Sequence, residues 1–247
     1  MSRLFAIGDI HGCLSPLNAL IDAIEPTKDD TIIFLGDMVD RGPDTKGVLD
    51  RIMALETTCK VIAIAGNHEE MMIGSVTELE YAKSWLRFGG AQALASFGLP
   101  DTPDSVKDIP FKYIYWLKNL ARCIIMDDFI FCHGAANPKV PIEKQNTELR
   151  WRFLNKEDSR HISGKTIICG HSEQRNGEVW QQDGLICIDT YAYGGGKLTA
   201  LQILSVNHFV AWQVAGQSSS QNSGQRTDQA TCQRRMITSE SSAPHQL

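Results

Sequence analysis

The sequence predicts an α/β fold in which the central strands are parallel. Near the start of the chain, a short apolar run is followed three times by a glycine-bounded polar turn and then by a helical pattern. The apolar runs are 4–7, 31–35 and 61–65. Repeated strand–turn–helix units imply parallel strands joined by right-handed crossovers. The three polar turns are therefore expected at one edge of the sheet.

Local signals mark where the first two helices begin. Ser15 is expected to cap the first helix and Pro16 to occupy its first position, while Pro26 ends it. Pro43 and Asp44 mark the start of the second helix. Apolar residues recur at helical spacing after both starts, so each helix has a face that can pack against the sheet.

The remainder of the chain is less regular. Residues 75–122 have a helical pattern, which we interpret as an insert or cap beside the site; ordinary packing of helices against the sheet is an equal alternative. Further strands are predicted at 123–126, 129–132, 166–169, 185–188, 198–204 and 209–214. From Gly216 the chain is rich in Ser, Gln and Thr. We therefore expect one domain over 1–215 and a disordered tail over 216–247.

Composition indicates a globular protein in a reducing compartment. The formal net charge of −5 gives no support for a nucleic-acid partner and disfavours an anionic membrane surface. No apolar run is long enough to span a bilayer, and the first residues lead into a strand without a charged and apolar leader. The seven cysteines include no CxxC pair, which argues against a disulfide framework or a zinc knuckle. We expect a cytoplasmic protein.

Polar side chains that can bind a metal follow five of the predicted strands. They are Asp9 and His11, Asp37, Asn67 and His68, His133, and His171. A single aspartate after a strand is usually a helix cap, and a single histidine is more often structural than a ligand. Several such groups at one sheet edge, beside glycines that permit close approach, favour a metal site. Mixed oxygen and nitrogen ligands suit Mn²⁺, Fe²⁺ or Zn²⁺.

Three of these turns resemble the signature motifs of the phosphoprotein phosphatase family of calcineurin-like metallophosphoesterases. The motifs are GDIHG at 8–12, GDMVDRG at 36–42 and GNHE at 66–69, in the family's order. His133 and His171, each beside a glycine, match its two later metal histidines. The resemblance covers about residues 3–205 and is to the bacterial serine/threonine protein phosphatase branch. It implies the calcineurin-like fold, a β-sheet sandwich flanked by helices with a helical insert.

The resemblance also implies two divalent metal ions, with Mn²⁺ the first choice. One ion would take Asp9, His11 and Asp37, and the other Asp37, Asn67, His133 and His171. A hydroxide that bridges the two ions would then attack phosphorus in line, without a protein nucleophile. Because the ligand imidazoles must be neutral on the nitrogen that faces the metal, metal binding should weaken in acid.

Three more residues receive catalytic roles from the same motifs. His68 is expected to protonate the leaving oxygen, with Asp40 keeping its imidazole protonated and oriented. Arg41 is expected to hold the phosphate, since a guanidinium can bind two oxygens at once. Glu69 is expected to support its turn.

Further contacts to the substrate phosphate are expected from an amide and a second arginine. Asn67 is the amide. The arginine should follow the His133 motif, and both Arg150 and Arg152 stand there, with Arg152 the preferred candidate. The spacing of Arg150, Trp151 and Arg152 departs from the family's pattern, in which tryptophan and arginine are separated.

Three functions are consistent with this sequence. The first is a serine/threonine protein phosphatase that hydrolyses phosphomonoesters of proteins or small molecules. The second is a symmetrical dinucleoside tetraphosphate (Ap4A) hydrolase, whose relatives tend to lack the aspartate at Asp40 because a nucleotide leaves more easily than an alkoxide. Asp40 and Glu69 therefore favour the phosphatase. The third is a silent metal-binding scaffold, against which Asp37, His68 and Arg41 argue.

Overall fold

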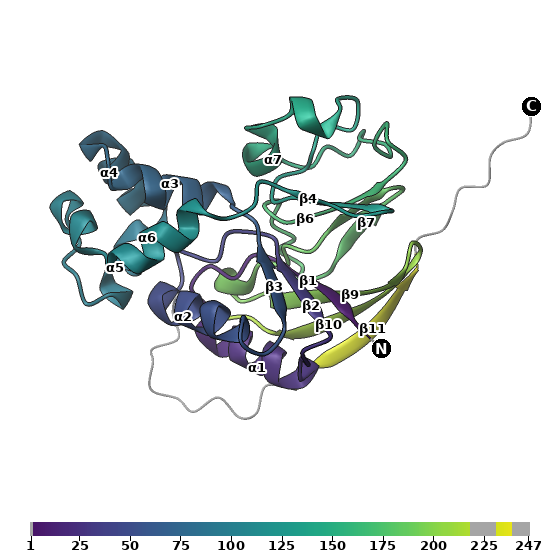
Figure 1. Cartoon of the computed structure of the whole chain (residues 1–247), viewed down its shortest axis with the longest axis horizontal. Helices are drawn as coiled ribbons and strands as arrows, with labels where there is room; N and C mark the ends of the chain where they lie inside the picture. Colours follow the sequence, from purple (N-terminus) through teal and green to yellow (C-terminus); the bar gives the residue numbers. More distant parts are fainter. Residues whose placement is uncertain (1, 218–230, 239–247) are drawn as a thin grey trace, which may run out of the picture.

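Two β-sheets packed face to face form the centre of the protein (Figure 1). The computed structural model describes residues 2–217 and 231–238. In the described residues, one sheet has six strands in the order β11-β10-β9-β1-β2-β3, and the other has five in the order β4-β5-β6-β8-β7. This α/β sandwich with flanking helices is the predicted fold class.

The parallel half of the six-stranded sheet carries the three sequence motifs. It contains β1 (Leu4–Ile7), β2 (Thr31–Phe34) and β3 (Lys60–Ala63), joined by α1 (Leu14–Ile24) and α2 (Thr45–Leu55). The strands pair in parallel as expected. The predicted start of α1 is wrong: Cys13 is its N-cap residue, and Ser15 and Pro16 lie within the first turn. Asp44 caps α2, with its Oδ1 accepting from the Gly47 amide at 2.7 Å.

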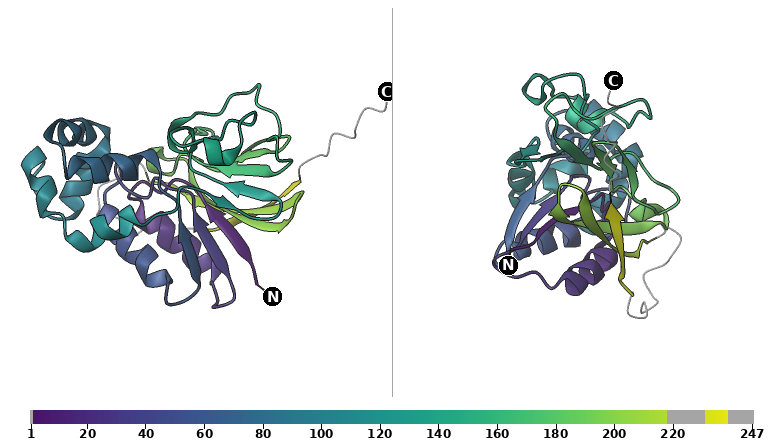
Figure 2. Two further views of the ribbon diagram at one scale, coloured as in Figure 1. Left: turned by 45° about the horizontal axis from the view of Figure 1, so that its top comes forward. Right: turned by 90° about the vertical axis from the view of Figure 1, so that its right-hand side faces the viewer.

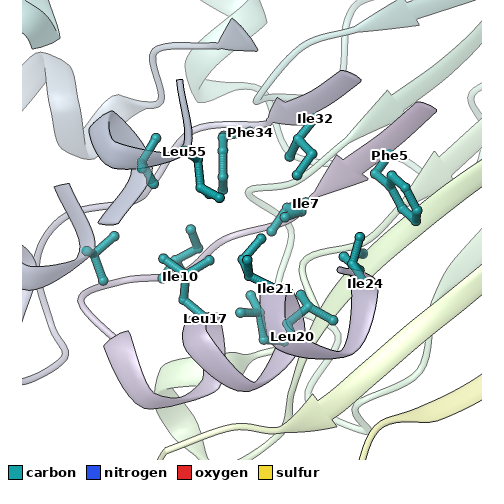
Figure 3. Close-up of a cluster of buried hydrophobic side chains, with 14 of the residues drawn as sticks. Phe5, Ile7, Ile10, Leu17, Leu20, Ile21, Ile24, Ile32, Phe34 and Leu55 are labelled. Carbon is teal, nitrogen blue, oxygen red and sulfur yellow. The ribbon is translucent and has the colours of Figure 1, made fainter. Parts of the chain in front are cut away.

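Alternating side chains divide each strand between two cores. On one face of the six-stranded sheet, Phe5, Ile7, Ile32 and Phe34 pack against α1 and α2, as Figure 3 shows. On the other face, Ala6, Ile33 and Leu201 meet Phe131, Ile168 and Ile186 of the second sheet. Strands that are buried on both faces read as continuous apolar runs, which is why they are visible in the sequence.

The second sheet consists of short strands beneath a small helix. Its strands are β4 (Ile124–Ile125), β5 (Phe129–Phe131), β6 (Thr166–Cys169), β7 (Trp180–Gln182) and β8 (Leu185–Cys187), and α7 (Glu148–Trp151) lies over it. The sequence did not predict β7, because its polar glutamines give no apolar run. The carboxyl ends of β5 and β6 bring His133 and His171 to the edge where the three motif turns lie.

A group of helices extends from the side of the two sheets (Figures 1 and 2). It contains α3 (Asn67–Ser75), α4 (Leu79–Trp85), the π-helical Leu86–Gly90, α5 (Ala91–Ser96), the 3₁₀ turn Pro103–Asp108 and α6 (Phe111–Lys118). The core of this helical group includes the fully buried Trp85. Val39, from the turn after β2, and Leu49 of α2 pack into the same core. Among the described residues, no helix is long and apolar enough to cross a membrane.

The six-stranded sheet continues through antiparallel strands to a strand within the predicted tail. These strands are β9 (Lys197–Ser205), β10 (His208–Ala215) and β11 (Gln233–Thr238). The prediction of disorder is therefore wrong for 233–238, and the tail residues 218–230 and 239–247 lie outside the described residues. An edge strand is held by backbone pairing and needs no apolar face, so the composition of these residues did not predict a strand. Arg234 adds a contact, with its Cζ 3.4 Å from the Trp212 ring centroid.

Removing β11 should measurably destabilise the protein. Truncation after residue 230 deletes a strand that pairs with β10 at six positions and covers Trp212, so we expect a lower melting temperature. A loss of 1 kcal/mol in a domain of this size corresponds to about 2–4 °C. Truncation after residue 238 is the matched control, because it leaves β11 in place. Equal melting temperatures for the two truncated proteins would show that β11 contributes nothing.

A buried carboxylate ties the start of the sheet together and should make stability depend on pH. Asp30 accepts hydrogen bonds from the backbone amides of Arg3 (2.9 Å) and Thr27 (2.8 Å), and from Arg3 Nη2 at 2.7 Å. The Arg3 guanidinium is the main reason that the pKa of Asp30 lies well below its usual range. A depressed carboxyl pKa stabilises the folded state above the unfolded-state pKa of about 3.9, and this stabilisation is lost as the pH falls through the folded-state pKa.

The Asp30→Asn variant tests that contribution. At pH 7 its free energy of unfolding should be about 1–3 kcal/mol lower than that of the parent, since hydrogen bonds to a charged group are lost. The difference should shrink as the pH falls below about 4, because the unfolded parent then binds a proton on Asp30 while the folded parent still keeps the carboxylate charged. Urea titrations at several pH values measure it. A difference that stays constant from pH 7 to strong acid would exclude the electrostatic explanation.

Candidate metal centre and active site

The motif turns have an unusual backbone conformation. Seven described residues other than glycine have positive φ, and five of them lie in these turns: His11, Asp37, Asp40, Arg41 and His171. Such conformations cost roughly 1–3 kcal/mol each and persist where the surrounding structure enforces them. Here the amides of Ile10 and His11 both donate to the Asp37 carbonyl, at 3.0 and 2.8 Å. The turns after β1 and β2 therefore hold each other in place.

The buried Glu69 carboxylate holds the turn after β2 in place through backbone amides. Its Oε2 accepts from the amides of Asp37 and Gly66, both at 2.8 Å, and its Oε1 accepts from Met38 at 2.8 Å and Val39 at 3.2 Å. The expectation that Glu69 supports a turn agrees with these contacts. Burial and the nearby Asp37 charge raise the pKa of Glu69 to about 7.

Two overlapping groups of side chains could each hold a metal ion. One is His11, Asp37 and His68, and the other is Asp37, His133 and His171; within each group the ligand atoms lie within 4.8 Å of one another. His133 Nε2 is 3.2 Å from Asp37 Oδ1 and 2.9 Å from Asn67 Oδ1. His11 Nε2 is 3.5 Å from Asp37 Oδ2. Because Asp37 belongs to both groups, it is placed as a bridging ligand would be.

Backbone carbonyls fix which imidazole nitrogen faces this centre. His11 Nδ1 donates to Val39 O and His133 Nδ1 to Leu35 O, both at 2.9 Å, while His171 Nε2 donates to Trp151 O at 3.1 Å. A carbonyl only accepts, so each bonded nitrogen carries a proton, and the opposite nitrogen is the one that could coordinate an ion. This arrangement is typical of metal-binding histidines. The donor set therefore fits divalent ions.

Two buried aspartates, Asp9 and Asp189, line the pocket beside the candidate ligands. Asp9 accepts from the His171 amide through both oxygens, at 3.2 Å, and a Cβ on Gly170 would lie 2.1 Å from its Oδ1. Burial, followed by the charges of Asp189 and Asp37, raises the pKa of Asp9 well above its usual range. Buried carboxylates that raise one another's pKa favour a bound cation. Asp189 was not predicted, although it follows β8 as Asp37 follows β2.

The imidazole of His68 is held by a buried carboxylate. His68 Nδ1 is 2.8 Å from Asp40 Oδ2, which also accepts from Trp85 Nε1 at 2.8 Å. Burial alone would lower the pKa of His68, but Asp37 and Asp40 outweigh it and raise that pKa. His68 Nε2 is 3.9 Å from Asp37 Oδ2. From this position the nitrogen can serve either as a proton donor or as a ligand. Trp85 was not among the predicted site residues.

Arg41 is held at the pocket by two residues that were not among the predicted site residues. Its Nη1 donates to Glu173 Oε1 at 2.9 Å, and its Cζ lies 4.6 Å from the Tyr193 ring centroid. The Tyr193 hydroxyl also donates to Glu173. Tyr193 in turn contacts His11 edge to face, with ring centroids 4.9 Å apart. Arg41 is thus fixed beside the candidate ligands.

Both candidates for the second phosphate arginine pair with acids in this structure. Arg150 pairs with Glu70, and the Arg152 guanidinium makes two 2.7 Å bonds to Asp158. Among the described residues, neither arginine lines the pocket at the candidate centre. Arg152 has extended φ and ψ angles, so neighbouring side chains point to opposite sides and Phe153 faces the pocket instead.

This pocket is large and chemically mixed. Its volume is about 860 Å³. Besides the candidate centre it is lined by aromatic side chains, by cations and by acids: Phe88, Trp151, Phe153, Trp180, Arg41, Lys156, Arg175, Glu173 and Asp189. The space beyond the candidate ligands is much greater than a phosphoryl group requires.

Curated relatives match part of this chain. A symmetrical bis(5'-nucleosyl)-tetraphosphatase of Ralstonia nicotianae is 29% identical over 136 residues, which is 54% of this chain and 42% of the relative. Serine/threonine-protein phosphatase 1 of Salmonella typhimurium is 35% identical over 89 residues, 36% of this chain and 39% of the relative. The chain thus spans about two-fifths of the length of each. The relatives are mostly named as the tetraphosphatase.

Solved structures share the whole architecture. A candidate diadenosine tetraphosphatase aligns with a TM-score of 0.65 and 21% identity, over 87% of this chain and 93% of its own. A cold-active protein-tyrosine phosphatase of a Shewanella species aligns with a TM-score of 0.61 and 17% identity, over 85% and 77%. At these identities the likeness shows the fold. The sequence model of the calcineurin-like phosphoesterases matches residues 2–199, which include every candidate ligand. The chain therefore belongs to the calcineurin-like phosphoesterase family.

Proposed function

We propose that the protein is a metal-dependent phosphoesterase that cleaves a dinucleoside tetraphosphate symmetrically. One observation carries the substrate class: the pocket continues from the candidate metal centre to a wall that bears both aromatic and cationic side chains. Nucleotides offer a π-surface and several negative charges, which suit such a wall. The names of most curated relatives support the same substrate class.

The candidate ligands would hold two divalent ions. They are Asp9, His11, Asp37, Asn67, His133 and His171. When bound, such ions lower the pKa of a coordinated water and neutralise charge on phosphoryl oxygens. Mn²⁺ is the proposed metal, because the set combines carboxylate and imidazole.

The protein's own groups orient the substrate and supply a proton. Arg41 presents its guanidinium to the phosphoryl oxygens, and its contacts with Glu173 and Tyr193 limit its freedom before substrate arrives. His68 donates the proton on Nε2 to the leaving oxygen. Asp40 keeps the imidazole oriented through its 2.8 Å contact to Nδ1 and stabilises the protonated form.

The second candidate function is hydrolysis of phosphomonoesters, including phosphoserine and phosphothreonine in proteins. The pair of His68 and Asp40 favours it, because an alkoxide leaving group needs a proton more than a nucleotide does. The Salmonella relative is named as such a phosphatase.

A direct comparison of substrates separates the two. The full chain, stripped of metal and reloaded with Mn²⁺, would be assayed on diadenosine tetraphosphate and on phosphoserine, phosphothreonine and phosphotyrosine peptides. We expect kcat/KM to be at least about ten-fold higher on the dinucleotide, a difference of roughly 1.4 kcal/mol in transition-state stabilisation, with ADP as the product. A preference for phosphopeptides would establish the second candidate. No hydrolysis of any of them would support the silent scaffold.

A further inference from the structure

The segment after α7 presents a fixed aromatic ring to the pocket. The Phe153 ring stacks on the His171 ring, with centroids 4.4 Å apart and planes at 27°. Phe153 is nevertheless 65% exposed, so its other face is open to the pocket. Trp151, 37% exposed, lines the same wall. Single exposed apolar residues are ordinary, but several around one pocket indicate a ligand surface.

Contacts behind this wall keep the segment rigid. The two bonds of Arg152 to Asp158 secure it from behind, and the Leu154 amide donates to Ser172 Oγ at 2.9 Å. Trp151 Nε1 donates to Glu70 at 3.2 Å. A ring that is already ordered loses little freedom when a ligand stacks on it, so the wall is prepared for binding.

Two cations stand beside the rings without strong partners. Lys156 is exposed, and among the described residues no hydrogen bond or ion pair of its ammonium group occurs. Arg175 is 75% exposed at its side chain; its Nε and Nη2 donate to Glu173 Oε2 at 3.3 Å, and its Cζ lies 5.4 Å from the Tyr191 ring centroid. Glu173 is the nearby acid, and Arg41 and the Tyr193 hydroxyl already bind its Oε1. Lys156 and Arg175 are therefore available to an anionic ligand.

We propose that this wall is the binding subsite for the nucleoside diphosphate that leaves the enzyme. The nucleobase stacks on the open face of Phe153 with Trp151 beside it, and Lys156 and Arg175 bind the diphosphate. The inference rests on the proposed function, since it names where one nucleoside diphosphate half of that substrate binds. It assigns substrate specificity to the segment after α7, in which the sequence had predicted a phosphate-binding arginine.

Binding measurements can test the subsite without any turnover. Isothermal titration calorimetry of the Mn²⁺-loaded full chain with ADP and with pyrophosphate distinguishes the contribution of the nucleoside to binding affinity from that of the phosphates. Phe153→Ala should weaken ADP binding about ten-fold, the effect expected for loss of one base–aromatic stack, and change pyrophosphate binding far less. Phe153→Trp should restore ADP binding. Replacing both Lys156 and Arg175 by glutamine should weaken the binding of ADP and of pyrophosphate.

Phe111→Ala is the matched control, because Phe111 is 74% exposed on α6 and is not among the described residues that line the pocket. It should bind ADP as the parent does. Equal ADP binding by the two alanine variants would overturn the subsite. An equal loss of ADP and pyrophosphate in Phe153→Ala would also overturn it, since the effect would then come from disturbing His171.

The subsite and the proposed function can fail separately. A protein that binds ADP through Phe153 but does not hydrolyse diadenosine tetraphosphate would disprove the function and retain the subsite. Hydrolysis of the dinucleotide with an unchanged KM in Phe153→Ala would retain the function and disprove the subsite.

Discussion

Replacing Asp37 with asparagine should lower metal-dependent turnover by several orders of magnitude. Asp37 is the one residue common to both candidate ligand groups, and three histidines surround its carboxylate. Burial opposes its ionisation, but the imidazoles of His133 and His68 outweigh burial and hold the pKa of Asp37 well below its usual range. An amide of the same shape keeps the packing and cannot supply a bridging negative charge.

The measurement is kcat/KM over a range of Mn²⁺ concentrations. Asp22→Asn makes the same chemical change on the surface, where the Asp22 side chain is 76% exposed and 3.6 Å from Arg51, and should leave turnover unaltered. If Asp37→Asn kept the parent's activity at saturating Mn²⁺, the dinuclear assignment would have to be abandoned.

The second large effect is expected for His68→Asn, and it should depend on the leaving group. General acids contribute typically 10²–10⁴-fold, and we expect a loss of about that size with alkyl phosphates. With p-nitrophenyl phosphate, whose leaving group needs little protonation, the loss should be much smaller. Equal losses on the two substrates would remove His68 from the acid role.

The Asp40→Asn variant adds a pH test of the same role. An acid works only while protonated, so activity on alkyl phosphates should decline as the pH rises through the pKa of His68. The Asp40 carboxylate helps to raise that pKa, so its removal should lower it and shift the decline to lower pH. Profiles of kcat against pH for parent and variant measure the shift. A shift to higher pH, or none, would contradict the pairing.

Much of the fold and of the candidate centre could be predicted because the signals are local. Apolar runs that end at glycines mark buried parallel strands, and parallel strands place their following turns at one sheet edge. For this reason the positions of Asp9, His11 and Asp37 followed from neighbouring residues. Asp189 carries the same local signal, because it follows β8.

The residues that could not be predicted act across long stretches of sequence. Trp85 reaches Asp40 from the helical group, and Glu173 reaches Arg41 from the far sheet. No local pattern reveals such contacts. The pairing of Arg152 could not be predicted for a related reason: an arginine in a suitable interval has no signature that separates a phosphate ligand from an ion pair with Asp158. The edge strand β11 depends on pairing with β10 rather than on its own composition.

The most direct test of the central claim is the number of metal ions that each chain holds. The full-length protein would be equilibrated with Mn²⁺, freed of excess ion and analysed by elemental mass spectrometry, together with Asp37→Asn and His68→Asn. The account predicts two ions per chain in the parent and in His68→Asn, because His68 serves as a proton donor, and fewer in Asp37→Asn. A single ion in the parent, or the loss of one ion in His68→Asn, would contradict it.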